Sequence, residues 1–470
     1  MLITLVIPIV TSIVIAALLY FFGGSNSYGI KIELTRKELV LGLVATLALS
    51  PLISWIGGKM AVDDAVGGYK EFWNGSMTLA LSERVPCERD GNCRHSYDCD
   101  GYKVVDQAAY TDSDGNYHSE ISHTEYHDCP YATEEYNYWL LDSLGDTHEL
   151  WMGWFSTSPQ EWRGGHGIPS DVGRGVPPEW TRIKELIAEG RAPGVTKENT
   201  YTNYVLASTN SILKPFSADV ERYKEEGLLP AHTENWKSPM LNDYTANKVV
   251  FVGDAPGNAS EWQDALARFN GALGMELQGD MHIVVVPAAK VDNPDAYKNA
   301  VRAYWQGKEF GKRALGKNGI IVVVALNRNG DRVEWVRADT GMPTGNGEME
   351  TALSAISDVP ATPYTLIGDV MSKPSGEEVE YIHGDGVIES IVFNDHPFKR
   401  ACMECKDKGD TGESYTYLKK DVKLTGWAKF WIAFMSIFAN ALVWAVLWYT
   451  DLFGESQQAE SNIHRDRWSY

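Results

Sequence analysis

Cysteine and histidine side chains gather in one polar stretch of the chain, at residues 83–131. Such a composition suits two kinds of chemistry: oxidation of cysteines to disulfides, and coordination of zinc by thiolates and imidazoles. Four cysteines allow three disulfide pairings, and the sequence does not choose among them. His123 and His127 are four residues apart, which would place them on one face of a helix and keeps zinc as the alternative. The whole cluster consists of Cys87, Cys93, Cys99 and Cys129 with His95, His118, His123 and His127.

The spacing of these cysteines favours disulfides. Five residues lie between Cys87 and Cys93 and again between Cys93 and Cys99, whereas zinc knuckles usually place two residues between their ligands. Disulfides form in oxidising compartments, so this prediction also places the stretch outside the cytoplasm. A second pair, Cys402 and Cys405, suits a local disulfide, a redox dithiol or half of a metal site.

Composition limits the class of protein. The 470 residues include 42 Lys and Arg against 63 Asp and Glu, which gives a net charge of −21 and a pI near 5.0. Because phosphate backbones are bound by clustered cations, nucleic acid is excluded as the main partner. The sequence contains no nucleophile elbow, phosphate loop or dinucleotide fingerprint, so whether the protein is an enzyme stays open.

Three uncharged runs predict membrane helices, and with them membrane lipid as a partner. They cover residues 1–22, 39–57 and 430–450. Each is close to the roughly 20 apolar residues that a helix needs to cross the hydrocarbon core. Trp and Tyr lie towards the ends of the third run, as in an interfacial aromatic belt. The alternatives are buried core helices and, for the first run, a cleaved signal peptide.

Basic residues beside these runs predict the orientation of an integral membrane protein. Lys31, Arg36 and Lys37 lie between the first and second runs, and Arg465 and Arg467 follow the third. Positively charged residues tend to stay in the cytoplasm. The N-terminus and the central segment are therefore expected outside, and the C-terminal tail in the cytoplasm.

This pattern divides the chain into four parts. Residues 1–57 hold two membrane helices and a short basic loop, and residues 58–245 form a cysteine-containing extracytoplasmic region of unknown fold. Residues 246–424 form an α/β domain with a juxtamembrane linker, and residues 425–470 hold the third membrane helix and the tail. Within the second part, residues 71–76 are typical of a turn between short strands.

The third part alternates regularly between strands and helices. Ser260 and Gln263 are typical of a capping box, and Asn293 before Pro294 is typical of a helix N-cap. A near-continuous apolar strand at residues 319–326 should be central and covered on both faces. The order β-α-β-α-β-β predicts a layered α/β/α sandwich within an α/β (α+β) outer segment. Strands are expected at residues 248–252, 281–286, 319–326 and 332–338, and a further helix at 348–356.

Two segments of this part resemble the TPM-domain family. Residues 311–326 contain the turn Asn318-Gly319 that leads into an apolar strand, and residues 333–341 form a strand that ends in a Gly-rich loop. Members of the family commonly carry both features in this order. The resemblance covers about residues 249–392. It implies an extracytoplasmic or lumenal domain that is tethered by a membrane helix.

The resemblance also implies a site at the loops beyond the strand ends, where α/β folds place ligands. Oxygen-bearing side chains in these loops are Asp254, Asp339, Asn346 and Glu348, and such ligands suit calcium. The alternative is that Asp339 and Asn346 only stabilise a tight loop.

Relatives in this family have been linked to different activities. Some are linked to phosphatase activity or calcium binding, and others to assembly or repair of membrane complexes. The resemblance therefore implies a membrane-anchored extracytoplasmic binding or assembly module, with protein partners in a membrane or envelope complex. The alternative is a metal-dependent, phosphatase-like hydrolase that acts outside the cytoplasm.

Overall fold

The fold is described from a computed structural model. It describes residues 2–22, 36–86, 93–150, 155–160, 175–208, 214–231, 248–307, 309–342, 345–376, 378–403 and 415–450. The chain forms two compact units. The first unit consists of residues 1–69, 200–214 and 402–470, and the second of residues 70–199 and 215–401.

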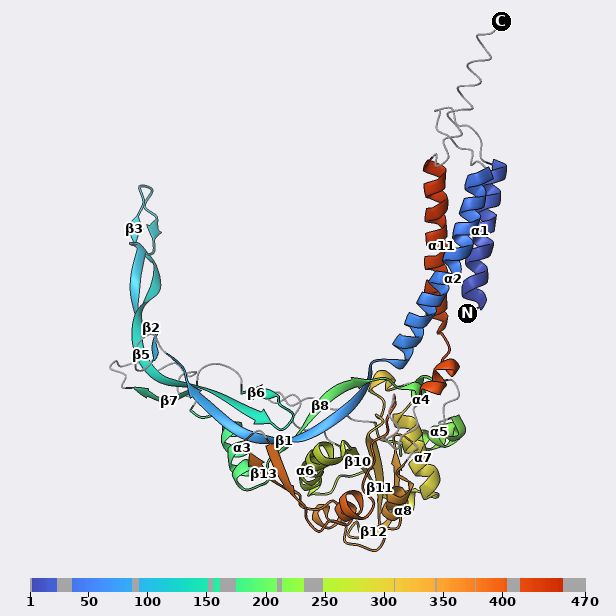
Figure 1. The fold of residues 1–470 in the computed structure, drawn as a ribbon. Coiled ribbons are helices and arrows are strands. Elements are labelled where there is room, and N and C mark those ends of the chain that lie inside the picture. Colours follow the sequence, from blue (N-terminus) through green and yellow to red (C-terminus); the bar gives the residue numbers. More distant parts are fainter. Residues whose placement is uncertain are drawn as a thin grey trace. The chain divides into compact units, whose positions relative to one another are not determined.

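Three long helices form the first unit, and they lie side by side in Figure 1. All three uncharged runs of the sequence are helical, with Pro8 and Pro51 inside their helices. The elements of this unit are α1 (Leu2–Phe22), α2 (Arg36–Val66), α4 (Tyr204–Ala207), the 3-10 helix η5 (Tyr415–Asp421) and α11 (Gly426–Tyr449).

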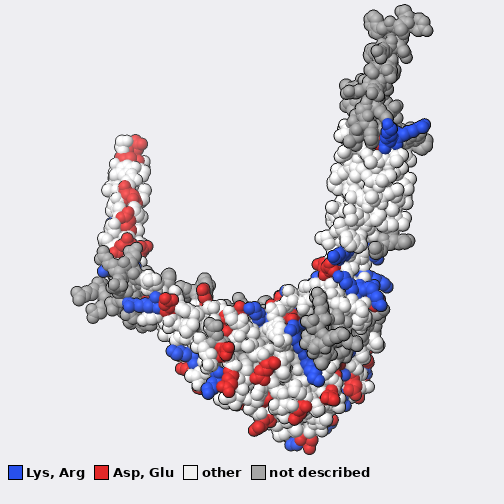
Figure 2. All heavy atoms as spheres, in the orientation of Figure 1, with Lys and Arg blue, Asp and Glu red and all other residues white. Residues whose placement is uncertain are grey.

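Large apolar side chains cover the outside of these helices. Val10, Val44 and Phe438 are examples, each more than half exposed. Figure 2 shows a continuous uncharged surface along the three helices, with basic side chains at one end and both basic and acidic side chains at the other. An apolar exterior is costly in water and favourable in lipid, so this surface is the first structural support for a membrane location.

The prediction of three membrane spans is supported for two helices. Among the described residues, α2 and α11 are long and apolar enough to cross a membrane. The apolar stretch of α1 whose side chains are described, Thr4–Leu19, is shorter than that limit. Length and composition therefore give two candidate spans rather than the expected three.

A four-stranded sheet in the order β12-β11-β10-β9 forms the centre of the second unit. Strands β9 (Val249–Phe251), β10 (Asp280–Pro287) and β11 (Gly319–Leu326) are parallel, and β12 (Val333–Thr340) is antiparallel to β11. The predicted order of strands and helices is therefore present. The strand at residues 319–326 is central in the sheet, as expected.

Helices cover both faces of this sheet because its central strands are apolar on both sides. In β11, Val322 packs with one set of helices, and its neighbour Val323 packs with the other. The first face is covered by α6 (Ala259–Leu277), α8 (Gly347–Ser354), α9 (Pro363–Leu366) and α10 (Val387–Glu389). The second face is covered by α5 (Ser217–Glu225) and α7 (Pro294–Trp305).

Of the two predicted helix starts, the one at Asn293 is confirmed and the one at Ser260 is wrong. Asn293 caps α7, and its side chain accepts a hydrogen bond from the amide of Ala296 at 3.1 Å. The capping box at Ser260 is wrong, because α6 begins at Ala259 after Asn258. Gln263 instead donates to the carbonyl of Val249 at 2.6 Å and accepts from its amide at 3.1 Å, which ties the helix to β9.

A second sheet has the order β2-β5-β1-β8. The turn expected at residues 71–76 is wrong, because these residues lie inside the long strand β1. Polar side chains of this segment bond to the α/β part, which explains why its sequence looks unlike a strand. The elements are β1 (Tyr69–Arg84), β2 (Cys93–Gln107), β5 (Ile121–Asp142), β6 (Thr147–Glu149), β7 (Phe155–Gln160), β8 (Gly194–Tyr201) and the helix α3 (Pro178–Ala188).

Short elements complete the second unit. They are the hairpin β3 (Tyr110–Thr111) and β4 (Tyr117–His118), the hairpin β13 (Met371–Ser375) and β14 (Glu378–Ile382), a π-helix at Ser390–Asp395 and the 3-10 helices Lys214–Phe216, Ala288–Lys290 and Gly311–Arg313.

Candidate functional site

The four predicted calcium ligands do not share one edge of the sheet. Asp254 follows the carboxyl end of β9. Asp339 lies near the carboxyl end of β12, but β12 runs antiparallel, and Asp339 pairs with Ile321 at the amino end of β11. Because the carboxyl ends of antiparallel neighbours lie at opposite edges, Asp254 and Asp339 are on opposite sides of the domain. The expectation that strand-end loops bring them together is therefore wrong.

Each of these side chains has a distinct environment. Buried Asp339 accepts a hydrogen bond from the Arg302 guanidinium at 2.7 Å, and Lys298 lies 3.2 Å from its second oxygen. Asn346 exchanges two hydrogen bonds with the backbone of Lys399, at 2.8 and 2.9 Å. Glu348 and Asp254 are exposed. Cations from α7 thus already neutralise the one buried carboxylate of the set.

Strands β2 and β5 form a two-stranded ribbon beyond the rest of their sheet, and His95, His123 and His127 lie on it. His118 lies in β4 of the short hairpin. His123 and His127 are both in β5, so their expected placement on one helical face is wrong. Residues four apart in a strand are on the order of 13 Å apart, too far for a shared zinc ion. No group of three or more His, Cys, Asp or Glu positioned for a metal is found in the described part of the chain.

Acidic partners hold the ribbon histidines. His123 lies 2.7 Å from Asp106 and 3.2 Å from Glu125, and the hydrogen bond to Asp106 is the largest of the effects that raise its pKa. Tyr102 stacks on His127 and donates to Glu125 at 2.6 Å. The contacts of His123 with Asp106 and of Tyr102 with Glu125 and His127 cross between the strands and stabilise the ribbon.

The cysteine prediction is supported in part. Cys93, Cys129 and Cys402 are disulfide-bonded, and no described cysteine is a free thiol. Cys87 and Cys405 lie outside the described residues, and the side chain of Cys99 is not described. No disulfide has both partners among the described side chains, so the pairing stays a prediction.

We expect Cys93, Cys129 and Cys402 to resist alkylation in the native, full-length protein without reductant. Each should react after reduction, which peptide mass spectrometry of iodoacetamide-treated protein measures. A chelator without reductant should leave the pattern unchanged, because it removes zinc but not disulfides. Alkylation after chelator alone would favour the zinc alternative, and alkylation in the untreated native protein would refute both.

The ribbon surface is acidic and aromatic. Tyr126 in β5 is 58% exposed, and Tyr117 in the β3/β4 hairpin that connects the two ribbon strands is 72% exposed. Figure 2 shows acidic side chains spread along this part of the chain. Residues 93–129 hold eight acidic residues and two basic ones. An isolated two-stranded ribbon is marginally stable in water, so the cross-strand contacts described above matter for its stability.

A second polar cluster is buried at the amino edge of the α/β sheet. Lys248 donates to Asp280, which lies 3.0 Å from the imidazole of His282. Asn74 of β1 donates to Asp280 at 2.9 Å and accepts from Lys248 at 2.9 Å. Thr196 of β8 donates to Asn74 at 3.0 Å, so the cluster joins the two sheets. Neither of the two pockets described below is lined by these groups. The hydrogen bonds of Asn74 with Asp280, Lys248 and Thr196 join the two sheets.

Burial alone would raise the pKa of the Asp280 carboxyl. The charge of Lys248, the imidazole of His282 and their hydrogen bonds outweigh burial and hold this pKa well below its usual range. Asp280 is thus ionised throughout the physiological range.

Polar side chains also meet inside the three-helix bundle. The inward side chains recur every four residues, such as Ser50 and Ser54 in α2. Trp444 donates to Ser12 at 3.0 Å, and Asn440 donates to Ser50 at 2.9 Å. We call this set the polar seam: Thr4, Ser12, Thr46, Ser50, Ser54, Ser436, Asn440 and Trp444. Small and polar residues at helix contacts are typical of membrane bundles, and their four-residue spacing is a signal that the sequence carries.

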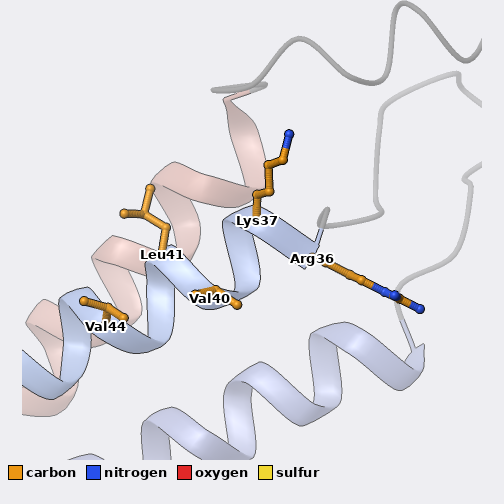
Figure 3. Close-up of a pocket in the computed structure, with 5 residues that line it drawn as sticks. All are labelled: Arg36, Lys37, Val40, Leu41 and Val44. Atoms are coloured by element: carbon orange, nitrogen blue, oxygen red, sulfur yellow. The ribbon is translucent and has the colours of Figure 1, made fainter.

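A shallow groove follows the outer side of α2. Figure 3 shows Val40, Leu41 and Val44 along its wall, with Arg36 and Lys37 extending from the end of the helix. The rise from Lys37 to Lys59 along α2 is roughly 33 Å, which matches the hydrocarbon thickness of a bilayer.

Comparisons with known proteins found no matching family model, no similar curated protein and no similar solved structure.

Proposed function

We propose that this protein is a membrane-anchored extracytoplasmic module that binds partner proteins of a membrane or envelope complex through the β2/β5 ribbon. The observation that carries the proposal is the exposed acidic and aromatic surface of that ribbon. Its charge favours a partner with a basic face, because complementary charges steer and orient association.

The anchor in this proposal consists of three spans, α1, α2 and α11. The support for α1 is its position in the bundle, where Ser12 donates to Thr46 at 2.8 Å and accepts from Trp444. A cleaved signal peptide would leave these polar groups facing lipid, where unpaired groups are costly.

The extracytoplasmic side is inferred from the cysteines. Disulfide-bonded Cys93, Cys129 and Cys402 suit an oxidising compartment. The charge rule is less decisive than the sequence suggests. Arg36 and Lys37 lie at one end of α2, but the other end carries Lys59 together with Lys419, Lys420, Lys423 and Lys429. The N-terminus outside and the tail in the cytoplasm remain part of the proposal.

The α/β part is proposed to be a TPM-like domain that serves as a rigid base for the ribbon. Its strand order and its helices on both faces support this assignment. Calcium or zinc binding stays a prediction. The hydrolase alternative gains no specific support, since its carboxylates Asp254 and Asp339 lie at opposite edges of the sheet.

The test is the size of the native complex after gentle extraction of the full-length protein with detergent. We expect Tyr117→Ser with Tyr126→Ser to shift the complex to the mass of the chain alone, because both side chains belong to the proposed contact surface. The matched control is Tyr364→Ser, which removes an exposed tyrosine from the second unit away from the ribbon. A wild-type protein that elutes at the mass of the single chain, or an unchanged complex in the double variant, would reject the proposal.

A further inference from the structure

A lysine-rich groove lies at one end of the three-helix bundle. It is formed by the later part of α2 and by the segment from η5 to the start of α11, and its volume is about 460 Å³. Ser54, Trp55 and Val62 of α2 and Val422 and Leu424 line its uncharged part. The basic part contains Lys59, Lys419, Lys420, Lys423 and Lys429, all from the first unit.

The charge of this groove is unusual for a chain with a net charge of −21. Five lysines and no acidic residue occur among its lining residues. Lys419 is paired with Asp63 at 2.8 Å, just outside the lining. In the described part of the chain, Lys59, Lys420, Lys423 and Lys429 have no carboxylate within ion-pair distance. Four like charges around one cavity repel each other, and an anion in the cavity would relieve that repulsion.

If α2 and α11 cross the membrane as proposed, the groove lies at the level of the membrane interface. Exposed Trp427 and Phe430 are in the first turns of α11, next to Lys429. Aromatic side chains at this level, with apolar side chains on one side and lysines on the other, are typical of the headgroup region. A ligand here would have its charged part among the lysines and its apolar part against Trp55 and the outer faces of α2 and α11.

We propose that this groove binds the phosphate-bearing headgroup of an anionic phospholipid. The ammonium groups would pair with the phosphate, and the acyl chains would follow the apolar helix surfaces. A soluble polyanion would contact the lysines but not the adjoining apolar wall. A lipid would contact both, with its headgroup at the lysines and its acyl chains on the apolar wall. The inference rests on the membrane anchor of the proposed function and not on the ribbon.

The experiment uses the full-length protein in nanodiscs of phosphatidylcholine with a small fraction of phosphatidylglycerol. Native mass spectrometry after release counts the lipids that stay bound. We expect phosphatidylglycerol to be retained over phosphatidylcholine, and Lys420→Gln with Lys423→Gln to lower that preference about tenfold to thirtyfold. The control is Arg328→Gln with Lys373→Gln, which removes the same charge from exposed positions of the second unit and should leave the preference unchanged.

Each further outcome has a separate meaning. Failure of the wild-type protein to enter nanodiscs would reject the anchor and the proposed function with it. Entry into nanodiscs with equal retention of the two lipids, or an equal loss in both double variants, would reject the groove alone. Displacement of phosphatidylglycerol by millimolar inorganic phosphate would show that the lysines bind any phosphate, and would overturn the assignment to a lipid.

Discussion

Asp280→Ala should destabilise the second unit by about 3–5 kcal/mol, which is the usual cost of removing one partner from a buried ion pair. The variant leaves the Lys248 ammonium buried with only Asn74 as a polar neighbour from this cluster. In a unit of this size, the melting temperature should fall by about 10 °C. Thermal unfolding of the full-length protein in detergent, followed by near-ultraviolet circular dichroism, measures the shift.

Two further variants show whether the loss of stability comes from the unpaired charge of Lys248 or only from the cavity that the removed side chain leaves. Asp254→Ala removes an exposed carboxylate and should change stability by less than about 0.5 kcal/mol. Lys248→Met combined with Asp280→Ala should be more stable than Asp280→Ala alone, because no unpaired charge remains. Additive losses in the double variant would mean that the network is not held together by charge.

The Asp280–Lys248 pair also predicts how the stability of the fold changes with pH. Because the pKa of Asp280 is lower in the folded protein than in the unfolded chain, ionised Asp280 favours folding. This contribution is complete above about pH 4, the ordinary carboxyl value, and is lost as the pH falls further. Asp280→Ala should therefore flatten the acid side of the stability profile.

Gly274→Ala should destabilise the protein by about 1–3 kcal/mol, although alanine is normally the better helix former. In an ordinary exposed helix the same change would gain about 1 kcal/mol. Here α6 packs directly against β1, and a Cβ atom at position 274 would lie 2.8 Å from the amide nitrogen of Asn74 and closer still to its carbonyl oxygen. Backbone atoms cannot rotate away, so helix and strand would have to separate.

The matched control is Gly347→Ala in the first turn of α8, where an added Cβ atom meets nothing within 4 Å. Chemical denaturation of both variants compares the two effects directly. We expect Gly347→Ala to be neutral or slightly stabilising. A gain of stability in Gly274→Ala would show that the α6–β1 contact is looser than the structure indicates.

Local patterns predicted the α/β part well, because its elements are defined by short-range periodicity. The apolar run at residues 319–326 is the central strand, and Asn293 caps its helix. The errors arise where contacts with residues far away in the sequence determine the local structure. Polar residues 71–76 look like a turn because Asn74 faces Asp280, some 200 residues away in the chain. Gln263 looks like a capping residue but bonds to β9.

The candidate site was less accessible to sequence reasoning than the fold. The alternation of apolar and polar residues predicts a strand but not its direction in the sheet. The sequence therefore did not reveal that β12 is antiparallel, and this direction places Asp339 away from Asp254. The lysine groove combines Lys59 with Lys420 and Lys423, which are about 360 residues apart in the sequence. Only the packing of α2 against α11 brings such residues together.

The polar seam has a consequence for biosynthesis. Its donors and acceptors come from both ends of the chain, with Ser12 near the start and Asn440 and Trp444 near the end. The ribosome adds about 5–20 residues per second, so roughly 20–70 s pass between the completion of α2 and the emergence of α11. During that interval the hydroxyl groups of α1 and α2 lack the partners that α11 provides. If the three helices form the membrane anchor proposed above, α1 and α2 would have to stay in the membrane without these partners while the central segment is translated.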